Sequence, residues 1–225
     1  MGSEMCIRDR FSMPRLKPAT VEGILERIEE AAQELFIKRG YNATTTREIA
    51  DAVGLTAGAL YSHYPSKEAL FQAVVKRYQR RLLGGRADNT LLRSLRHSRF
   101  PYDIPQLAKG IRDLVRQNRA YWLLWYIDIV EFDGKHFRSQ VAPKALIGAP
   151  ELKARFDELR DDGTLRMEPE VAFVMVYMHL FNYYCVETLF GGNNHYGVSE
   201  EKAVALMAEV FLNGMLAPGQ KAKAK

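Results

Sequence analysis

The feature that constrains the fold most is a pair of very short helices predicted at about 45–64. Thr45 and Glu48 have the Thr-x-x-Glu spacing of a capping box, which opens the first of the two helices. Thr56 follows a glycine-containing turn and can cap the second helix, and Pro65 ends it. Two short helices joined in this way predict a helix-turn-helix, although many helical hairpins share the pattern.

Helical periodicity continues on both sides of this pair, and no run of alternating apolar and polar residues predicts a strand. The further helices predicted from apolar stripes lie at about 21–39, 66–84, 105–118, 119–133, 150–162, 170–190 and 199–216. Lys38 and Arg39 precede Gly40, where we expect a left-handed cap to end the first helix. The sequence therefore predicts an all-α fold.

We expect four segments along the chain. Residues 1–20 have the character of a disordered leader or non-native extension, and residues 218–225 form a Lys/Ala tail. Between them we expect a helix-turn-helix domain at 21–84 and a second helical domain at 85–217.

Composition excludes several classes of protein. The 225 residues carry a net charge of +5 and 47% hydrophobic residues, which fits a globular chain with a mild preference for acidic partners. Cys6 and Cys185 are too few for a disulfide framework, and no apolar signal segment precedes them, so we expect a cytoplasmic protein. Residues 170–190 reach membrane length but contain His179, Asn182 and Glu187, which favours a buried helix over a membrane span.

The region at about 22–83 closely resembles the DNA-binding region of tetracycline-repressor (TetR) family regulators. The residues that carry the resemblance are Ala32, Leu35, Phe36, Gly40, Tyr41, Thr46, Ile49, Ala50, Gly54, Leu55, Leu60, Tyr61, His63, Tyr64, Ser66, Lys67, Glu68 and Leu70. The rest of the chain matches that family only in layout. The resemblance implies an N-terminal three-helix DNA-binding domain, a C-terminal helical domain for ligand binding and dimerisation, and a homodimer.

The candidates for contact with DNA lie on the two short helices and just after them. They are Thr45, Thr46, Arg47, Thr56, Ala57, Gly58, Ala59, Tyr61, Ser62, His63 and Lys67. Thr45 and Thr46 stand at a helix N-terminus, where hydroxyl and backbone N–H groups can donate to phosphate. The resemblance places Thr46, Tyr61 and Lys67 at phosphate-contacting positions, while capping or packing is the alternative for the threonines and for Tyr61.

Base reading is expected to depend on few groups. The first turn of the second short helix offers almost no hydrogen-bonding reach, although alanine methyls can touch thymine and Gly58 permits close approach. Arg47 is the one long donor that we expect to reach a base edge, and contact with phosphate is the alternative. Specificity is expected to rest on Arg47, Thr56, Ser62 and the shape of the DNA.

The second domain offers aromatic and methionine side chains that can line a cavity or simply form a core. The candidate ligand residues are Trp122, Trp125, Tyr126, Asp128, Met175, Met178 and His179. Asp128 and Glu131 interrupt an apolar helix three residues apart, so each carboxylate must find a cation or a donor, in a structural pair or on a ligand. The last two helices are expected to form the dimer interface through Phe181, Tyr184, Met207 and Phe211.

These features together predict a ligand-responsive transcriptional regulator. We expect a repressor that binds a palindromic double-stranded DNA operator as a dimer and is released by a small apolar or aromatic effector. No motif of a catalytic site, a metal site or a cofactor occurs, so we do not expect an enzyme. The alternatives are a helical small-molecule-binding or enzymatic protein that retains the helix-turn-helix as scaffold, and a membrane-associated helical protein.

Overall fold

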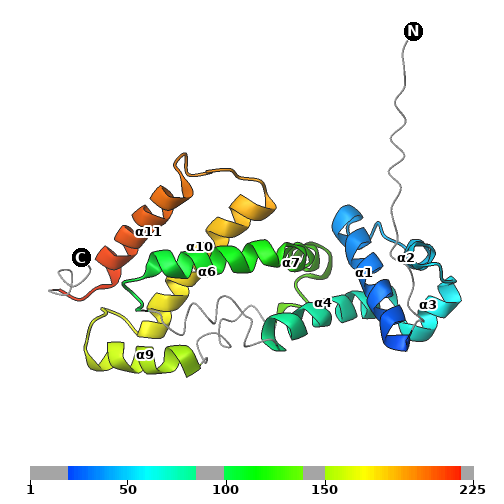
Figure 1. The fold of residues 1–225 in the computed structure, drawn as a ribbon, viewed down its shortest axis with the longest axis horizontal. Coiled ribbons are helices and arrows are strands. Elements are labelled where there is room, and N and C mark those ends of the chain that lie inside the picture. The colour runs from blue at the N-terminus through cyan, green and yellow to red at the C-terminus, as the bar shows by residue number, and fades with distance from the viewer. Residues whose placement is uncertain (1–19, 85–98, 139–149, 219–225) are drawn as a thin grey trace, which may run out of the picture.

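A computed structural model describes residues 20–84, 99–138 and 150–218, and it shows the predicted all-α fold there. Its helices are α1 (Val21–Arg39), α2 (Thr46–Val53), α3 (Ala57–His63), α4 (Lys67–Gly84), α6 (Ile104–Gln117), α7 (Arg119–Phe132), α9 (Pro150–Asp161), α10 (Pro169–Leu189) and α11 (Glu200–Met215) (Figure 1). In this part of the chain, the β-structure is one isolated bridge between Leu165 and Leu216. Each helix lies within two residues of its predicted bounds.

Local capping explains the helix starts in the N-terminal region. The Thr45 hydroxyl accepts a hydrogen bond from the Glu48 backbone N–H, and the Glu48 carboxylate accepts one from the Thr45 N–H, which completes the predicted capping box. The Thr56 hydroxyl caps α3 in the same way through the Ala59 N–H. The two short helices therefore begin where the sequence predicts.

The helix end at Gly40 differs from the prediction. Its φ of 86° is positive, but its ψ of 164° is extended, so Gly40 is not in the left-handed helical conformation expected of it. The chain leaves α1 in an extended direction and enters the turn that leads to α2. The left-handed conformation occurs instead at Gly54, at the end of α2.

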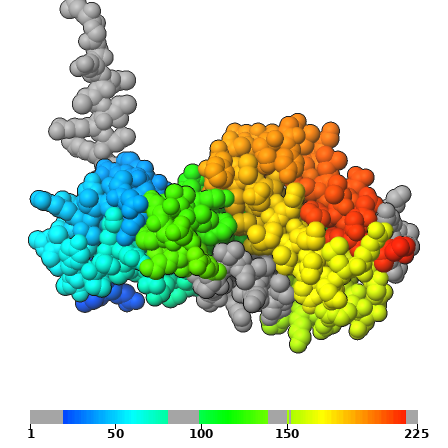
Figure 2. All heavy atoms as spheres, turned by 180° about the vertical axis from the view of Figure 1, so that it is seen from behind, coloured from blue at the N-terminus to red at the C-terminus, as the bar shows by residue number. Residues whose placement is uncertain are grey.

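Two hydrophobic cores organise the described residues. The first joins α1–α4 to Tyr121 and Leu124 of α7 and to Phe137, which follows that helix. The second joins α6, α9, α10 and α11. Figure 2 shows the N-terminal helices (blue and cyan) and the α9–α11 region (yellow to red) at opposite ends, with residues of the 99–138 segment (green) between them. Because Trp122 and Trp125 pack against both cores, α7 connects the two halves.

The long apolar helix α10 is a core helix of the C-terminal half. Ala172, Phe173, Val176 and Leu180 are fully buried among its neighbours, and Cys185 is buried on the same helix. Within the described ranges, no helix combines the length and apolar character that a membrane span requires. The preference for a buried helix over a membrane span is therefore confirmed.

Several sequence predictions fall outside the described residues. These are most of the leader at 1–20, including Cys6, and most of the tail at 218–225. The expected domain boundary after Gly84 stays a prediction.

Candidate nucleic-acid interface

The helix-turn-helix is held by buried contacts on its inner side. Leu60 of α3 and Ile49 of α2 are fully buried in the N-terminal core. At the end of α3, the Tyr64 hydroxyl donates to the Glu29 carboxylate of α1 at 2.9 Å, and burial raises the pKa of Tyr64. Arg77 of α4 lies 3.6 Å from the same carboxylate. These contacts fix the position of α3 against α1 and α4.

The outer side of α3 is open to solvent. Thr56, Gly58, Tyr61, Ser62 and His63 are exposed, and Tyr61 keeps 48% of its surface accessible. The two alanines between them, at positions 57 and 59, are half-buried. A surface of small groups, followed by hydroxyls and an imidazole, can approach the floor and edges of a DNA groove closely.

Gly58 lies in the middle of this open surface. A Cβ atom built there would meet only the Thr56 hydroxyl, at 4.0 Å. The fold therefore does not need a glycine at this position, although glycine costs a helix about 0.5–1 kcal/mol relative to alanine.

Thr46 and Tyr61 come together at the edge of the exposed face. Their hydroxyl oxygens lie 3.1 Å apart, which brings the N-terminus of α2 next to α3. Two adjacent hydroxyls beside a helix N-terminus can both donate to one phosphate group. The structure thus brings together two of the residues predicted to contact phosphate.

Thr45 and Arg47 flank Thr46 in the sequence, but the Thr45 side chain has partners within the protein and the Arg47 side chain is exposed. The Thr45 hydroxyl and N–H are both engaged with Glu48, so the structure gives Thr45 the capping role that was the alternative to DNA contact. The backbone hydrogen bond from Thr45 lowers the pKa of Glu48, as do the Thr45 hydroxyl and Arg39. Arg47 is exposed, and within the described chain its guanidinium forms no ion pair, so it can reach a DNA base or phosphate.

Lys67 has a role that the sequence did not indicate. Its ammonium group donates to the carbonyl oxygens of Tyr41 and Thr44, both at 2.8 Å, and lies 4.1 Å from the centre of the Tyr41 ring. Two of its three N–H donors therefore hold the turn before α2. These contacts do not test whether Lys67 also contacts phosphate, so that contact stays a prediction.

Asp128 is buried and paired within its own segment, which favours the structural alternative over a ligand site. Its carboxylate accepts from the backbone N–H groups of His136 and Phe137, both at 3.1 Å, and lies 2.6 Å from His136 Nδ1. Its side chain is fully buried. Asp128 therefore organises the turn after α7, which is the structural alternative that the sequence left open, with His136 as its partner.

The other candidate ligand residues divide into two groups. Trp122, Trp125 and Tyr126 are half-buried in an aromatic cluster that includes Phe181, so they remain candidates. Met175, Met178 and His179 lie on the exposed face of α10, and Met175 is 51% exposed. The helix turns these three side chains away from its own core, so their place in a ligand site stays a prediction.

The predicted dimer residues are largely buried in their own chain. Phe181, Tyr184 and Met207 are at most 6% exposed and belong to the C-terminal core, and Phe211 is half-buried against His179. These four side chains therefore do not form the outer surface of α10 and α11. The exposed apolar side chains of α10 and α11 are instead Val171, Met175, Met178, Leu206 and Val210.

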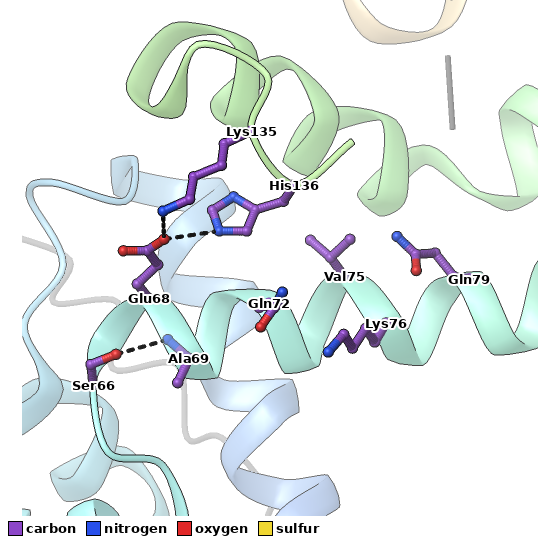
Figure 3. Close-up of a pocket in the computed structure, with 9 residues that line it drawn as sticks. All are labelled: Ser66, Glu68, Ala69, Gln72, Val75, Lys76, Gln79, Lys135 and His136. Atoms are coloured by element: carbon purple, nitrogen blue, oxygen red, sulfur yellow. Dashed lines mark hydrogen bonds and ion pairs between the residues drawn. The ribbon is translucent and has the colours of Figure 1, made fainter. Parts of the chain in front are cut away.

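A polar pocket of about 590 Å³ lies along α4, beside the turn that follows α7 (Figure 3). At one end, Lys135 donates to Glu68 at 2.6 Å, and His136 Nε2 lies 3.3 Å from the same carboxylate oxygen. The hydrogen bond from Lys135 lowers the pKa of Glu68. None of the predicted ligand residues lines this pocket.

Comparisons with known proteins show what the helix-turn-helix segment is similar to. Residues 28–74 match the family of bacterial regulatory proteins, tetR family. Over 55 residues, the chain is 42% identical to the HTH-type transcriptional repressor KstR2 of Rhodococcus jostii (strain RHA1). That alignment covers 24% of this chain and 27% of the repressor, so the chain matches about a quarter of its curated relative.

Solved structures share the fold over most of the chain. A protein from Mesorhizobium loti, described as a TetR-family transcriptional regulator, superposes with a TM-score of 0.61 at 22% identity, covering 88% of this chain and 100% of the other. The SmeT–triclosan complex superposes with a TM-score of 0.50 at 19% identity, covering 88% and 93%; SmeT is the repressor of a multidrug efflux pump of Stenotrophomonas maltophilia. The resemblance drawn from the sequence is confirmed: residues 28–74 match the tetR-family model, and the chain shares its fold with solved TetR-family regulators.

Proposed function

We propose that this protein is a ligand-responsive transcriptional regulator, and specifically a repressor, that binds a palindromic operator as a homodimer. The observation that carries the proposal is the open face of α3, bordered by the Thr46 and Tyr61 hydroxyls 3.1 Å apart. This face belongs to the segment that matches the TetR family, and the relative KstR2 is named a transcriptional repressor.

The length and charge of each side chain on this face determine which part of the DNA it contacts. Thr46 and Tyr61 contact phosphate and set the register, with backbone N–H groups at the start of α2. Arg47, exposed on the same helix, reads a base edge, preferably guanine O6 and N7. The small residues of α3 let its backbone lie close to the bases.

Dimerisation is supported by the exposed apolar face of α10 and α11. Val210 is 70% exposed, and Val171 and Met175 each keep 51% of their surface accessible. Apolar side chains repeated along two neighbouring helices favour burial against a second copy about a two-fold axis. Met175 and Met178 thus serve this interface rather than a ligand site.

The effector is a small apolar or aromatic molecule bound beside α7 and α10. Trp122 and Trp125 lie there in the aromatic cluster, and the Trp122 Nε1 atom is buried without a hydrogen-bond partner in the described chain. A ligand with an acceptor at this point would satisfy that N–H group. SmeT, which shares the fold, was captured with triclosan, an aromatic compound.

The protein acts by binding rather than by catalysis, in the cytoplasm, where its DNA target lies. The alternative of an enzyme that keeps the helix-turn-helix as scaffold gains no support from the described residues.

Selection of bound fragments from random duplex DNA tests the proposal. We expect an inverted repeat whose half-sites lie about one helical turn, ~34–36 Å, or a multiple apart. The Tyr61→Phe variant removes one hydroxyl of the pair and should weaken binding to the selected duplex without changing its sequence preference. Recovery of unrelated fragments with no repeated half-site would overturn the proposal.

A further inference from the structure

The turn between α1 and α2 is held by a side chain from the C-terminal half. Glu131, in the last turn of α7, accepts hydrogen bonds from the backbone N–H of Tyr41 at 2.8 Å, through Oε1, and of Asn42 at 2.5 Å, through Oε2. One carboxylate thus binds two successive N–H groups. Hydrogen bonds to an ionised acceptor are stronger than those between neutral groups.

Gly40 makes room for this contact. A Cβ atom at Gly40 would lie 2.9 Å from Glu131 Oε1, closer than real Cβ contacts allow. The residue also has a φ of 86°, which side chains rarely adopt. Glycine at this position therefore serves the approach of α7 to the turn, besides ending α1.

The same turn is held from its other side by α4. Lys67 donates to the carbonyl oxygens of Tyr41 and Thr44, so the carbonyl groups are fixed by one half of the molecule and the N–H groups by the other. The turn continues directly into Thr45, the N-cap of α2. Its position therefore determines where the helix-turn-helix lies relative to α7.

Aromatic packing surrounds this contact, in which Glu131 is the charged group that α7 contributes. The Tyr41 ring lies 4.4 Å from the Phe132 ring of α7 and 5.6 Å from the Phe71 ring of α4, centre to centre. Such aromatic packing holds α7 against the turn, but its energy changes little when α7 rotates by a small angle. Two N–H groups that share one carboxylate have a defined geometry, which a small rotation of α7 would break.

We propose that Glu131 is a positioning residue that fixes the orientation of the helix-turn-helix on the C-terminal half, and thereby the separation of the two recognition helices in the dimer. This inference rests on the proposed function. Because α7 also carries Trp122 and Trp125, a displacement of α7 by an effector at these residues would reach the turn through Glu131.

The test uses the full chain with Glu131→Ala, Glu131→Gln and the control Val130→Ala, whose side chain is 79% exposed on the same helix. The first measurement is amide hydrogen exchange at Tyr41 and Asn42. Glu131→Ala should lower their protection about tenfold, Glu131→Gln less, and the control not at all.

The second measurement compares binding to inverted-repeat duplexes whose half-site spacing is changed by one or two base pairs. We expect the wild type and Val130→Ala to prefer one spacing, and Glu131→Ala to reduce that preference about tenfold. Binding to a duplex with a single half-site should be unchanged in all variants, since the reading surface itself is intact.

The outcomes separate the two proposals. If the wild type is selective for spacing and Glu131→Ala is equally selective, the inference is overturned while the proposed function stands. Equal weakening on all duplexes, single half-sites included, would show general destabilisation and also overturn it. A wild type that binds no selected duplex would overturn the proposed function itself.

Discussion

The two halves of this molecule differ in how closely the sequence determines which side chains face outward. The short helix α2 is strongly amphipathic: Ile49 and Ala50 are fully buried, whereas the charged Arg47 and Asp51 are exposed. Helices α7 and α10 are apolar on nearly every side, so their pattern does not separate core from surface. Helices with polar faces can thus be oriented from sequence, whereas uniformly apolar ones require their neighbours to be known.

The largest expected effect concerns the buried carboxylate of the C-terminal half. Asp128→Asn should lower the free energy of unfolding by about 3–5 kcal/mol, because an amide presents N–H groups to donors that need an acceptor. Urea unfolding monitored by circular dichroism measures this free energy of unfolding. Asp133→Asn, an exposed neighbour, is the control and should change stability by less than about 0.5 kcal/mol. Equal stability of the two variants would return Asp128 to the list of ligand residues.

The next effect tests the exposed apolar face. Val210→Asp should weaken the dimer more than about 100-fold, or about 3 kcal/mol, because a carboxylate would be buried without a partner. Sedimentation velocity over a range of concentrations measures the change. Val130→Asp, at a site on α7 that is 79% exposed against 70% for Val210, is the matched control and should leave the dimer intact. Dimers of unchanged strength in Val210→Asp would place the interface elsewhere.

Base reading by the N-terminal half gives a smaller, local effect. Arg47→Ala should cost roughly 1–3 kcal/mol at one base position and little at others. Competition binding with duplexes substituted at each position would show it. If affinity falls uniformly across sequences and the salt dependence weakens, Arg47 contacts phosphate instead.

Gly58 offers a test in which stability and binding move in opposite directions. Gly58→Ala should stabilise the folded protein by about 0.5–1 kcal/mol, since the new methyl group meets open space on α3. The same methyl group should weaken binding to the selected duplex by taking up room in the groove. Thermal unfolding and fluorescence anisotropy measure the two effects. A more stable variant with unchanged affinity would remove Gly58 from the interface.

The smallest effect concerns the pH dependence of the capping box. The hydrogen bond from Thr45 lowers the pKa of Glu48 below its usual value of 4.5, so its contribution to stability is complete above pH 4.5 and is lost as the pH falls through the lowered pKa. The difference in melting temperature between the wild type and Glu48→Gln should therefore be present at neutral pH and shrink below pH 4.5. A difference that is constant with pH would show that the charge of Glu48 is not involved.

The sequence predicts contacts that are local and misses those that are not. Thr45 and Glu48 are three residues apart, and a known backbone geometry relates them, so the capping box follows from spacing alone. The pairing of Asp128 with His136 depends on the turn between them, which spacing leaves open. Glu131 and Tyr41 are 90 residues apart, and nothing near either residue indicates the other.

The candidate DNA surface could be predicted because its residues occur within one short segment at fixed spacing. The effector and dimer residues could not, since Met175 and Phe181 are equally apolar in sequence, yet one is 51% exposed and the other 6%. The packing of α10 against its neighbouring helices determines which of them faces inward, and Phe181 packs on Trp122 and Trp125 of α7.

Amide hydrogen exchange of the full chain, with and without its selected duplex, tests the central claim most directly. The account predicts that DNA protects the N-terminus of α2 and the whole of α3, from its N-cap Thr56 to His63, while the exposed faces of α9 and α11 are unchanged. Protection confined to other surfaces, with α3 exchanging equally in both states, would contradict the assignment of this face to DNA.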